Sequence, residues 1–297
     1  MTAPISDGVS ERLSEYLAVL GKHLWDRRQR ASFAMYVLGL LSEQRRKSVE
    51  PIATLFVSEP DEADKVHQRL LHFLGAAPWP DDEVRRTAVR FALTDITRRA
   101  PIQSLIIDDT SFPKSGSQSV GVQRQYCGAL GKVANCQVIV SLTAASERSH
   151  LPLDAQPYLP QQWIDSQKLR EQAHISSDVT FRSKPELALS MLARAKANGV
   201  PRGVVLADAG HGDSCPFREG VRRLGMHFPS GFSSTRRYSL CETNKPWTLL
   251  RHCWREWERV LSVGTHGAKE PRMALKAHLG SGSRGAGSRL PLCLLRT

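Results

Sequence analysis

The chain has 297 residues, 41% of them hydrophobic and 24% charged, so it can bury a core and is not disordered throughout. A formal net charge of +12 and a pI near 9.7 favour a polyanionic partner: DNA, RNA or an anionic membrane surface. No run of about 18 apolar residues occurs, so no transmembrane helix is predicted, and the N-terminus lacks the pattern of a signal peptide. Six cysteines without a CxxC pair argue against a zinc ribbon and indicate reduced thiols.

Residues 1–100 are predicted to be entirely helical. Apolar residues recur at spacings of three and four, the pattern of an amphipathic helix. Ser48 is a candidate N-cap for a short helix with Pro51 in its first turn. The other predicted helices cover residues 13–24, 31–43, 61–74 and 81–99.

The pattern changes from helical to extended at Pro101. Strands are predicted at 105–109, 121–127 and 137–143. The polar, Pro- and Gln-rich stretch 147–183 is predicted to be an excursion with one short helix near 165–173. A helix at 184–198, a strand at 203–208, a helix at 215–224 and a short strand at 226–229 complete an α/β pattern.

Two of the predicted strands lead into carboxylates. Asp108 and Asp109 follow Leu105-Ile106-Ile107, and Asp208 follows Val204-Val205-Leu206, 99 residues after Asp109. Because side chains alternate along a strand, only one of the adjacent pair can point into a given site. The alternative interpretation is structural, since Asp commonly caps the turn or helix that follows a strand.

Taken together, the two acids suit a site for hard divalent cations. Mg²⁺ prefers carboxylates and keeps several waters, so it needs few protein ligands. Two such ions about 3.5–4 Å apart can stabilise the attacking and leaving oxygens when a phosphodiester is cleaved. In a basic chain, this chemistry predicts an enzyme that cuts or joins nucleic acid.

Longer motifs make the prediction specific. Ile107-Asp108-Asp109-Thr110-Ser111-Phe112-Pro113-Lys114, the segments 119–128 and 131–138, and Lys184-Pro185-Glu186 with 199–210 resemble the bacterial insertion-sequence transposases of the DDE type. The insertion-sequence 701 group is the most similar. Residues 36–41 with Arg46 and Lys47 resemble its N-terminal helical region, and the resemblance covers roughly residues 30–234.

The resemblance implies an RNase H-like catalytic domain over residues 101–235, preceded by a helical DNA-binding region. In that family, Asp109 matches the first metal-binding acid and Asp208 the second, with Asp108 remaining the alternative to Asp109. The third acid of the family is a glutamate on a late helix, and its position here is unknown. Glu256 and Glu258 resemble it only superficially, and charges on a solvated helix are the simpler interpretation of both.

The composition changes again after residue 235. Residues 236–297 hold twelve Lys and Arg against four Asp and Glu, and include the low-complexity stretch Ser281–Arg289. We expect this tail to be disordered and to be the product of a truncated or frameshifted copy that lacks the third acid. A test is the nucleotide sequence near codon 235, read in the other frames for a continuation of the family pattern.

Several further side chains are candidates for the site. Lys114, Arg124 and Lys132 follow the first acid and are candidate phosphate contacts, or else ordinary loop charges. Tyr126 and Trp163 are candidates for stacking on a base, with packing as the alternative role. His211 and Asp213 are candidates for the metal shell, with an ordinary polar loop residue as the alternative.

The sequence therefore predicts a DDE transposase, an enzyme that cleaves DNA and transfers strands with two Mg²⁺ or Mn²⁺ ions. Double-stranded DNA is the expected partner, as terminal inverted repeats and as target, with self-association on DNA and no membrane. The expected location is the bacterial cytoplasm, at the nucleoid. Two alternatives remain: a catalytically dead DNA-binding remnant and a nuclease of similar core with other substrates.

Overall fold

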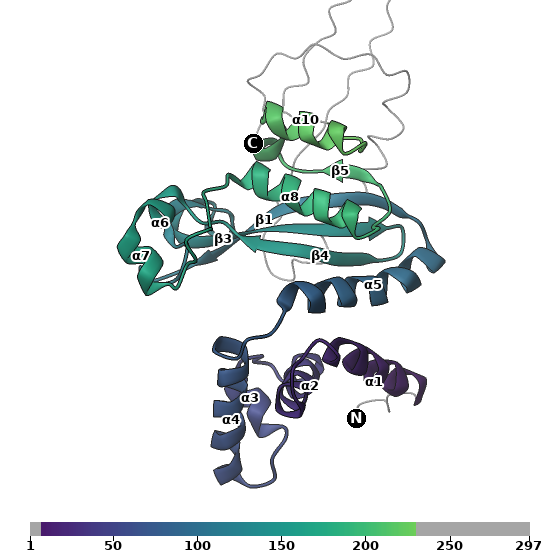
Figure 1. Ribbon diagram of the computed structural model, residues 1–297, viewed down its shortest axis with the longest axis vertical. Helices are drawn as coiled ribbons and strands as arrows, with labels where there is room; N and C mark the ends of the chain where they lie inside the picture. The colour runs from purple at the N-terminus through teal and green to yellow at the C-terminus, as the bar shows by residue number, and fades with distance from the viewer. Residues whose placement is uncertain (1–6, 230–297) are drawn as a thin grey trace, which may run out of the picture. The chain divides into compact units, whose positions relative to one another are not determined.

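A computed structural model describes residues 7–229 of the chain (Figure 1). The described part divides into two compact units. The first contains everything up to Pro101 together with Leu151–Asp154, and the second contains Ile102–His150 and the chain from Ala155 onward. Within the described residues, no helix has the length and apolarity needed to cross a membrane.

Up to Pro101, every regular element of the described chain is a helix. The helices are α1 (Asp7–Gly21), α2 (Arg27–Leu41), α3 (Val49–Thr54), α4 (Pro60–Gly75) and α5 (Asp81–Arg99). Ser48 is the N-cap of α3, as its position before Pro51 predicted, although its side chain makes no capping hydrogen bond. The unit as a whole is not purely helical, because it also includes Leu151–Asp154 of a strand.

Two apolar clusters hold these helices together. Leu20, Leu24, Phe33, Phe73 and Val84 form one cluster, in which the Phe73 and Trp79 rings stack at 5.7 Å. The other contains Ile52, Ala53, Val66 and Leu70. Gly39 of α2 is needed beside it, because a Cβ at that position would come within 2.3 Å of the Ile52 side chain.

The second unit is built on a mixed five-stranded sheet. Its strands are β1 (Ile102–Pro113), β2 (Gln123–Cys127), β3 (Lys132–Ser146), β4 (His150–Pro157) and β5 (Val204–Leu206). The order runs β2-β3-β1-β5, and β4 also pairs with β3. β1 is antiparallel to β3 and parallel to β5, so the fold is mixed α/β, as expected.

β1 and β5 pair over three residues, with Ser104 opposite Val204 and Ile106 opposite Leu206. Gly203 lets the chain approach at the start of this ladder, since a Cβ there would lie 2.9 Å from the Gln103 carbonyl oxygen. Beyond Leu206, His227 forms a further parallel bridge to Val204. Because β1 and β5 run parallel, their C-terminal ends lie at the same end of the sheet, although they are about 100 residues apart in sequence.

The strand predictions need several corrections. Residues 226–229, predicted as a strand, form only an isolated bridge at His227, and β5 is shorter than the predicted 203–208. β1 and β3 are longer than predicted, because their polar ends are extended by pairing with each other. β2 begins at Gln123 rather than Gly121, which has φ +75° in the turn before it. β4 was not predicted within 147–183, because Pro152 and Pro157 are untypical of strands. Proline is tolerated in an edge strand, where its missing N–H removes no hydrogen bond of the ladder.

Three helices lie between β4 and β5 in the chain: α6 (Gln161–Asp165), α7 (Gln167–Gln172) and α8 (Lys184–Ala197). Two more come after β5: α9 (Ala209–Gly212) and α10 (Cys215–Arg223). α8 packs on β3 and α10 packs on α8 (Figure 1). Gly220 makes the second contact close, because a Cβ there would lie 2.6 Å from Leu189. Cys127 and Cys136 are free and buried among apolar neighbours, as predicted.

Candidate active site

The two predicted acids lie beyond the parallel ladder of β1 and β5. The last pair of that ladder is Ile106 with Leu206, and Asp109 and Asp208 follow it by three and two residues. Asp109 was predicted to lie at the end of its strand. This is wrong, because β1 continues to Pro113 by pairing with β3. The first acid is therefore held within a paired strand, and the second at the start of a helix.

Asp109 has two carboxylate oxygens in different environments. Oδ2 accepts a hydrogen bond from the Lys184 ammonium at 2.8 Å. Oδ1 is buried and has no hydrogen-bond partner among the described residues. The side chain is 21% exposed. One oxygen of this carboxylate is thus paired with a cation. The other is buried away from water and makes no hydrogen bond with the described residues that would compensate for that loss.

Asp208 is the N-cap of α9. Its Oδ1 accepts hydrogen bonds from the His211 backbone N–H at 3.2 Å and from the His211 ring at 2.9 Å. The hydrogen bond from the His211 side chain lowers the pKa of Asp208 below its ordinary value, against the opposing effect of desolvation. The carboxylate is 61% exposed, so it is ionised and accessible at neutral pH.

His211 lies between the two acids. Its side chain is 2% exposed and packs edge-on against Phe217. An ionised carboxylate can only accept, so the ring Nδ1 carries the proton that bonds Asp208. In the neutral ring, Nε2 is then an acceptor; it lies 3.8 Å from Asp109 Oδ1, and neither atom has a partner among the described residues.

This arrangement places two buried acceptors face to face with no donor between them. Such a pair is unfavourable unless a proton or a cation satisfies it. The prediction for His211 left two interpretations open, a polar loop residue and a member of a metal shell. It is buried between Asp109 and Asp208, which is compatible with either interpretation.

Asp108 lies on the other face of β1. It pairs with Ser141 of β3, whereas Asp109 pairs with the fully buried Val140. Lys184 contacts β1 on the Asp109 face. The surrounding protein desolvates the Asp108 carboxyl group and raises its pKa, and the charges of Asp109 and Asp208 raise it further. The Asp109 N–H donates to Asp108 at 2.9 Å and opposes the rise.

Lys184 was not predicted as a site residue. It is the first residue of α8, and its ammonium lies 5.6 Å from the centre of the Tyr158 ring as well as on Asp109. The start of α8 is held by Glu186, whose Oε2 accepts from both the N–H and the hydroxyl of Ser183 at 2.7 Å. The only sequence signal was its place in the Lys184-Pro185-Glu186 motif, 75 residues from Asp109.

The candidate DNA-contact residues are all exposed. Lys114 follows β1, Arg124 lies on β2, and Lys132 begins β3. Tyr126, opposite Val133, is 64% exposed and remains a candidate for stacking. Trp163 is not accessible for stacking, because it is buried and its ring N–H donates to the Val122 carbonyl at 2.9 Å.

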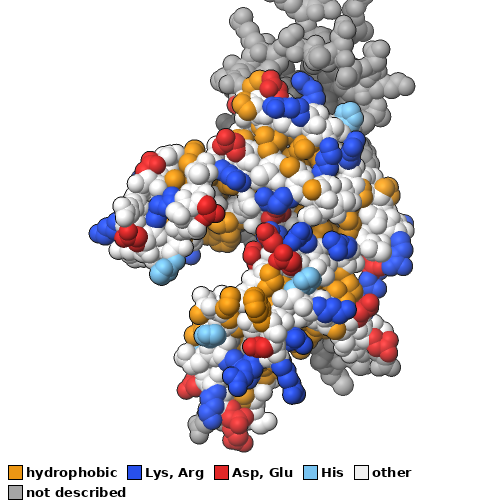
Figure 2. Space-filling view, viewed as in Figure 1, with side chains coloured by type: hydrophobic (Ala, Val, Ile, Leu, Met, Phe, Trp, Pro, Cys, Tyr) orange, Lys and Arg blue, Asp and Glu red, His pale blue; other side chains and the backbone are white. Residues whose placement is uncertain are grey.

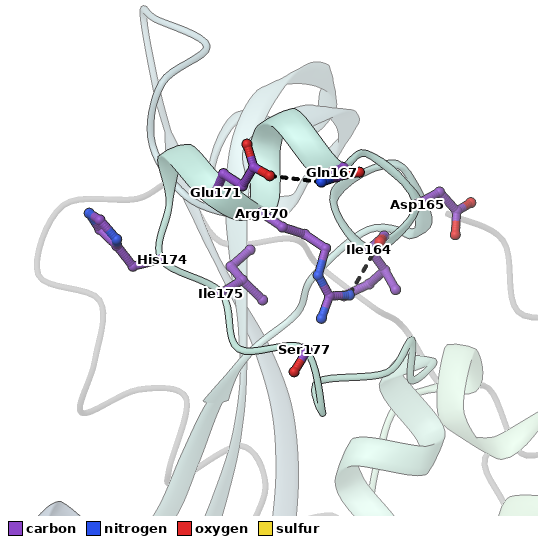
Figure 3. Close-up of a pocket in the computed structure, with 8 residues that line it drawn as sticks. All are labelled: Ile164, Asp165, Gln167, Arg170, Glu171, His174, Ile175 and Ser177. Carbon is purple, nitrogen blue, oxygen red and sulfur yellow. Dashed lines mark hydrogen bonds between the residues drawn. The ribbon is translucent and has the colours of Figure 1, made fainter.

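A hollow of about 750 Å³ lies beside α6 and α7 (Figure 3). It is lined by Ile164, Asp165, Gln167, Arg170, Glu171, His174, Ile175 and Ser177. Arg170 crosses it to donate to the carbonyls of Ile164 at 3.3 Å and Val179 at 3.1 Å. Neither Asp109 nor Asp208 lines this hollow.

Comparison with known proteins decides the family. The family described as DDE superfamily endonuclease matches residues 19–255. The chain belongs to this superfamily. It is also similar to a probable transposase for insertion sequence element IS701 from Microchaete diplosiphon, with 29% identity over 189 residues. That similarity covers 64% of the chain and 45% of the relative, so the chain spans less than half the length of this relative.

The DDE superfamily match extends past residue 235, where the resemblance was predicted to end, and stops at residue 255. The candidates for the third acid, Glu256 and Glu258, lie outside the described residues, as does the predicted tail 236–297. Within residues 7–229, no group of three or more His, Cys, Asp or Glu side chains is arranged to hold a metal ion. Among the described residues, Asp109 and Asp208 are therefore the candidate acids, and the position of a third acid stays unknown.

Proposed function

We propose that the chain is a transposase with an RNase H-like core that cleaves double-stranded DNA and transfers strands, using Asp109 and Asp208 as its metal-binding acids. The observation that carries the proposal is the meeting of these two acids around His211, at the end of the β1–β5 ladder. Membership of the DDE superfamily and similarity to a probable transposase support it.

The residues present fit a divalent cation. Asp109 Oδ1 and His211 Nε2 are buried acceptors that have no partner within residues 7–229, and Asp208 offers an exposed carboxylate. Carboxylate oxygens are the ligands that Mg²⁺ and Mn²⁺ prefer. Asp109 and Asp208 would hold the ions, as a two-metal site. Bound ions would polarise the phosphoryl group and stabilise charge on the leaving oxygen.

The reaction proposed is two successive displacements at phosphorus, a hydrolysis followed by a transesterification. In the first, water attacks the phosphorus at the transposon end; its oxygen forms the new P–O bond, the P–O3′ bond breaks, and a proton passes to the released 3′-hydroxyl. In the second, that 3′-hydroxyl attacks a target phosphodiester and displaces another 3′-hydroxyl. His211 keeps Asp208 oriented and ionised throughout, since its Nδ1–H donates to that carboxylate.

The DNA would be guided by the basic strands beside the acids. Between Asp109 and Glu147 the sequence contains no acid, while Lys114, Arg124 and Lys132 are all exposed there. Figure 2 shows Lys and Arg side chains spread over the viewed face of the molecule. We propose that these residues contact phosphates, that the helices of 1–100 recognise terminal inverted repeats, and that the chain self-associates on DNA.

The second candidate function is a DNA-binding remnant without catalysis. It is favoured by one observation: within residues 7–229, no group of three or more His, Cys, Asp or Glu side chains is arranged to hold a metal ion. A remnant would keep the basic surface and the salt-dependent affinity that such a surface gives. It would not cleave.

One experiment separates the two functions. The purified full chain is incubated with Mg²⁺ or Mn²⁺ and a labelled duplex carrying the element's terminal repeat. We expect metal-dependent nicking that falls by at least about 100-fold in Asp109→Asn and in Asp208→Asn. Asp165→Asn, a change at an exposed acid of α6, serves as the matched control and should keep full activity. Binding without nicking in the unmodified chain establishes the remnant.

A further inference from the structure

The Asp109 carboxylate is already paired with a cation supplied by the chain. Lys184 Nζ is 2.8 Å from Oδ2, in the range of a charge-assisted hydrogen bond. The same ammonium lies 5.6 Å from the centre of the Tyr158 ring, within reach of a cation–π interaction. The Lys184 side chain is nevertheless 30% exposed. It is therefore held in place by attraction on two sides but is not enclosed.

A divalent ion on Asp109 would lie close to this ammonium. A divalent ion and an ammonium bound to the two oxygens of one carboxylate repel each other, and the partly buried site screens this repulsion poorly. The metal and the Lys184 ammonium consequently compete for Asp109. The Lys184 side chain is long and partly exposed, and it starts from the first residue of α8. Its ammonium can therefore move away from Asp109 by rotation of the side chain, without a change in the backbone.

We propose that Lys184 is an exchangeable counter-ion: it neutralises Asp109 before metal binds and transfers to a DNA phosphate when the metal arrives. The proposal rests on the proposed function, since it assumes a metal at Asp109 and DNA beside it. A phosphate is the partner of suitable chemistry, because the displaced ammonium stays at the edge of a site built to receive a phosphodiester. Lysine binds phosphate as a compact, mobile charge.

The exchange couples the two ligands. Metal releases the ammonium for DNA, and DNA draws the ammonium away from the metal site, so each raises the affinity of the other. Without DNA, Lys184 opposes metal binding. This sign is opposite to that of an ordinary site residue, whose removal weakens the binding of metal.

The first test measures Mn²⁺ binding to the full chain without DNA, by the EPR signal of free Mn²⁺. Lys184→Met should bind Mn²⁺ more tightly, by roughly fivefold to tenfold, because a partly exposed competing charge is removed. Lys184→Arg should restore the affinity of the unmodified chain. Lys196→Met, at the other end of α8 where Nζ bonds the Leu224 carbonyl, is the matched control and should change nothing.

The second test measures duplex DNA binding with EDTA and with Mn²⁺. We expect Lys184→Met to match the unmodified chain in EDTA, where Lys184 is engaged on Asp109, and to bind more weakly by about fivefold in Mn²⁺. Circular dichroism and thermal unfolding establish that the variants are folded. If Lys184→Met is not, Lys184→Gln takes its place.

The outcomes distinguish this proposal from the proposed function. If Asp109→Asn abolishes Mn²⁺ binding but Lys184→Met leaves it unchanged or weakens it, the exchange is wrong and the metal site stands. A loss of DNA affinity in Lys184→Met that is equal with and without Mn²⁺ also overturns the exchange. If Asp109→Asn binds Mn²⁺ as the unmodified chain does, the metal site itself is wrong, and the exchange falls with it.

Discussion

His211 is a buried residue whose two ring nitrogens face two different acids. Nδ1 donates to Asp208 at 2.9 Å, while Nε2 lies 3.8 Å from Asp109. Residues that orient a metal-binding carboxylate through a hydrogen bond are known to affect metal affinity strongly, although they act through the ligand. The ring also fills space against Phe217, so its packing and its polar contacts have to be separated experimentally.

Two substitutions of His211 separate these contributions. His211→Phe keeps the ring volume but removes both nitrogens, and we expect the affinity for Mn²⁺ to fall by about 10-fold to 100-fold. His211→Asn puts an amide near the position of Nδ1, so it should recover part of that loss by bonding Asp208. Metal titration gives the affinities, and thermal unfolding shows whether packing is kept. An unchanged affinity in His211→Phe would contradict the role of the ring nitrogens.

At the scale of single residues, the sequence proposed Asp109 and Asp208 but not the side chains that contact them. The choice of Asp109 over Asp108 remains a proposal, and it is supported by the contact of Asp109 with Lys184. Lys184 itself could not be predicted from pattern, because its contact with Asp109 depends on how α8 packs on the sheet. The same holds for the burial of His211, since the glycines around it are typical of an exposed loop.

Among the elements, α8 has the best-defined start. The Ser183 N–H and hydroxyl both donate to Glu186, and these hydrogen bonds lower the pKa of the Glu186 carboxyl group. A carboxyl group with a lowered pKa stabilises the fold above its unfolded pKa of about 4.3, and this contribution is lost as the pH falls through the folded pKa. Because Lys184 lies between these two residues, the cap also fixes where its side chain begins.

We therefore expect a pH-dependent effect of Glu186→Ala. At pH 7 the variant should lose about 1 kcal/mol of unfolding free energy, the usual cost of a lost cap. Below about pH 4 the difference should shrink, because the protonated glutamate of the unmodified chain no longer makes the charged cap. Urea unfolding at several pH values measures it. The control is Glu50→Ala in the first turn of α3, where the N-cap side chain makes no bond; an equal pH effect there would refute the assignment.

The helices of the second unit were predicted more accurately than its strands. The predicted helices 184–198 and 215–224 match α8 and α10 closely. β4 was missed because Pro152 and a polar composition suggest a loop, and only its pairing with β3 makes it a strand. Strand pairing depends on partners far along the chain, whereas a helix forms its hydrogen bonds within itself.

For the molecule as a whole, the net charge of +12 is the property that bears on DNA. Proteins that neutralise phosphates release counter-ions, so their affinity for DNA falls steeply with salt. The sequence predicted a polyanionic partner from this charge and, among the 41 Lys and Arg side chains, Lys114, Arg124 and Lys132 as candidate phosphate contacts. All three are exposed, so they are accessible to DNA.

Replacing these three residues by glutamine tests that assignment. We expect the slope of log affinity against log salt to become shallower by about 2 to 3, since each lost phosphate contact removes about 0.9. Fluorescence anisotropy with a duplex at several salt concentrations measures the slope. The control variant replaces Lys168, Arg202 and Arg222, which are exposed elsewhere on the same unit. Equal slopes in the two triple variants would show that the effect is one of net charge alone.

The parallel pairing of β1 with β5 has a consequence for the order in which the molecule matures. Ile106 and Leu206 are 100 residues apart in sequence, and the contact between them closes a long loop that contains β2 to β4 and α8. Closing such a loop is slow, because its entropy is lost before the contacts that compensate for it have formed. During synthesis, Asp109 and Lys184 can therefore meet before β5 is in place, while Asp208 joins them last. The proposed site is therefore complete only once β5 has joined the sheet.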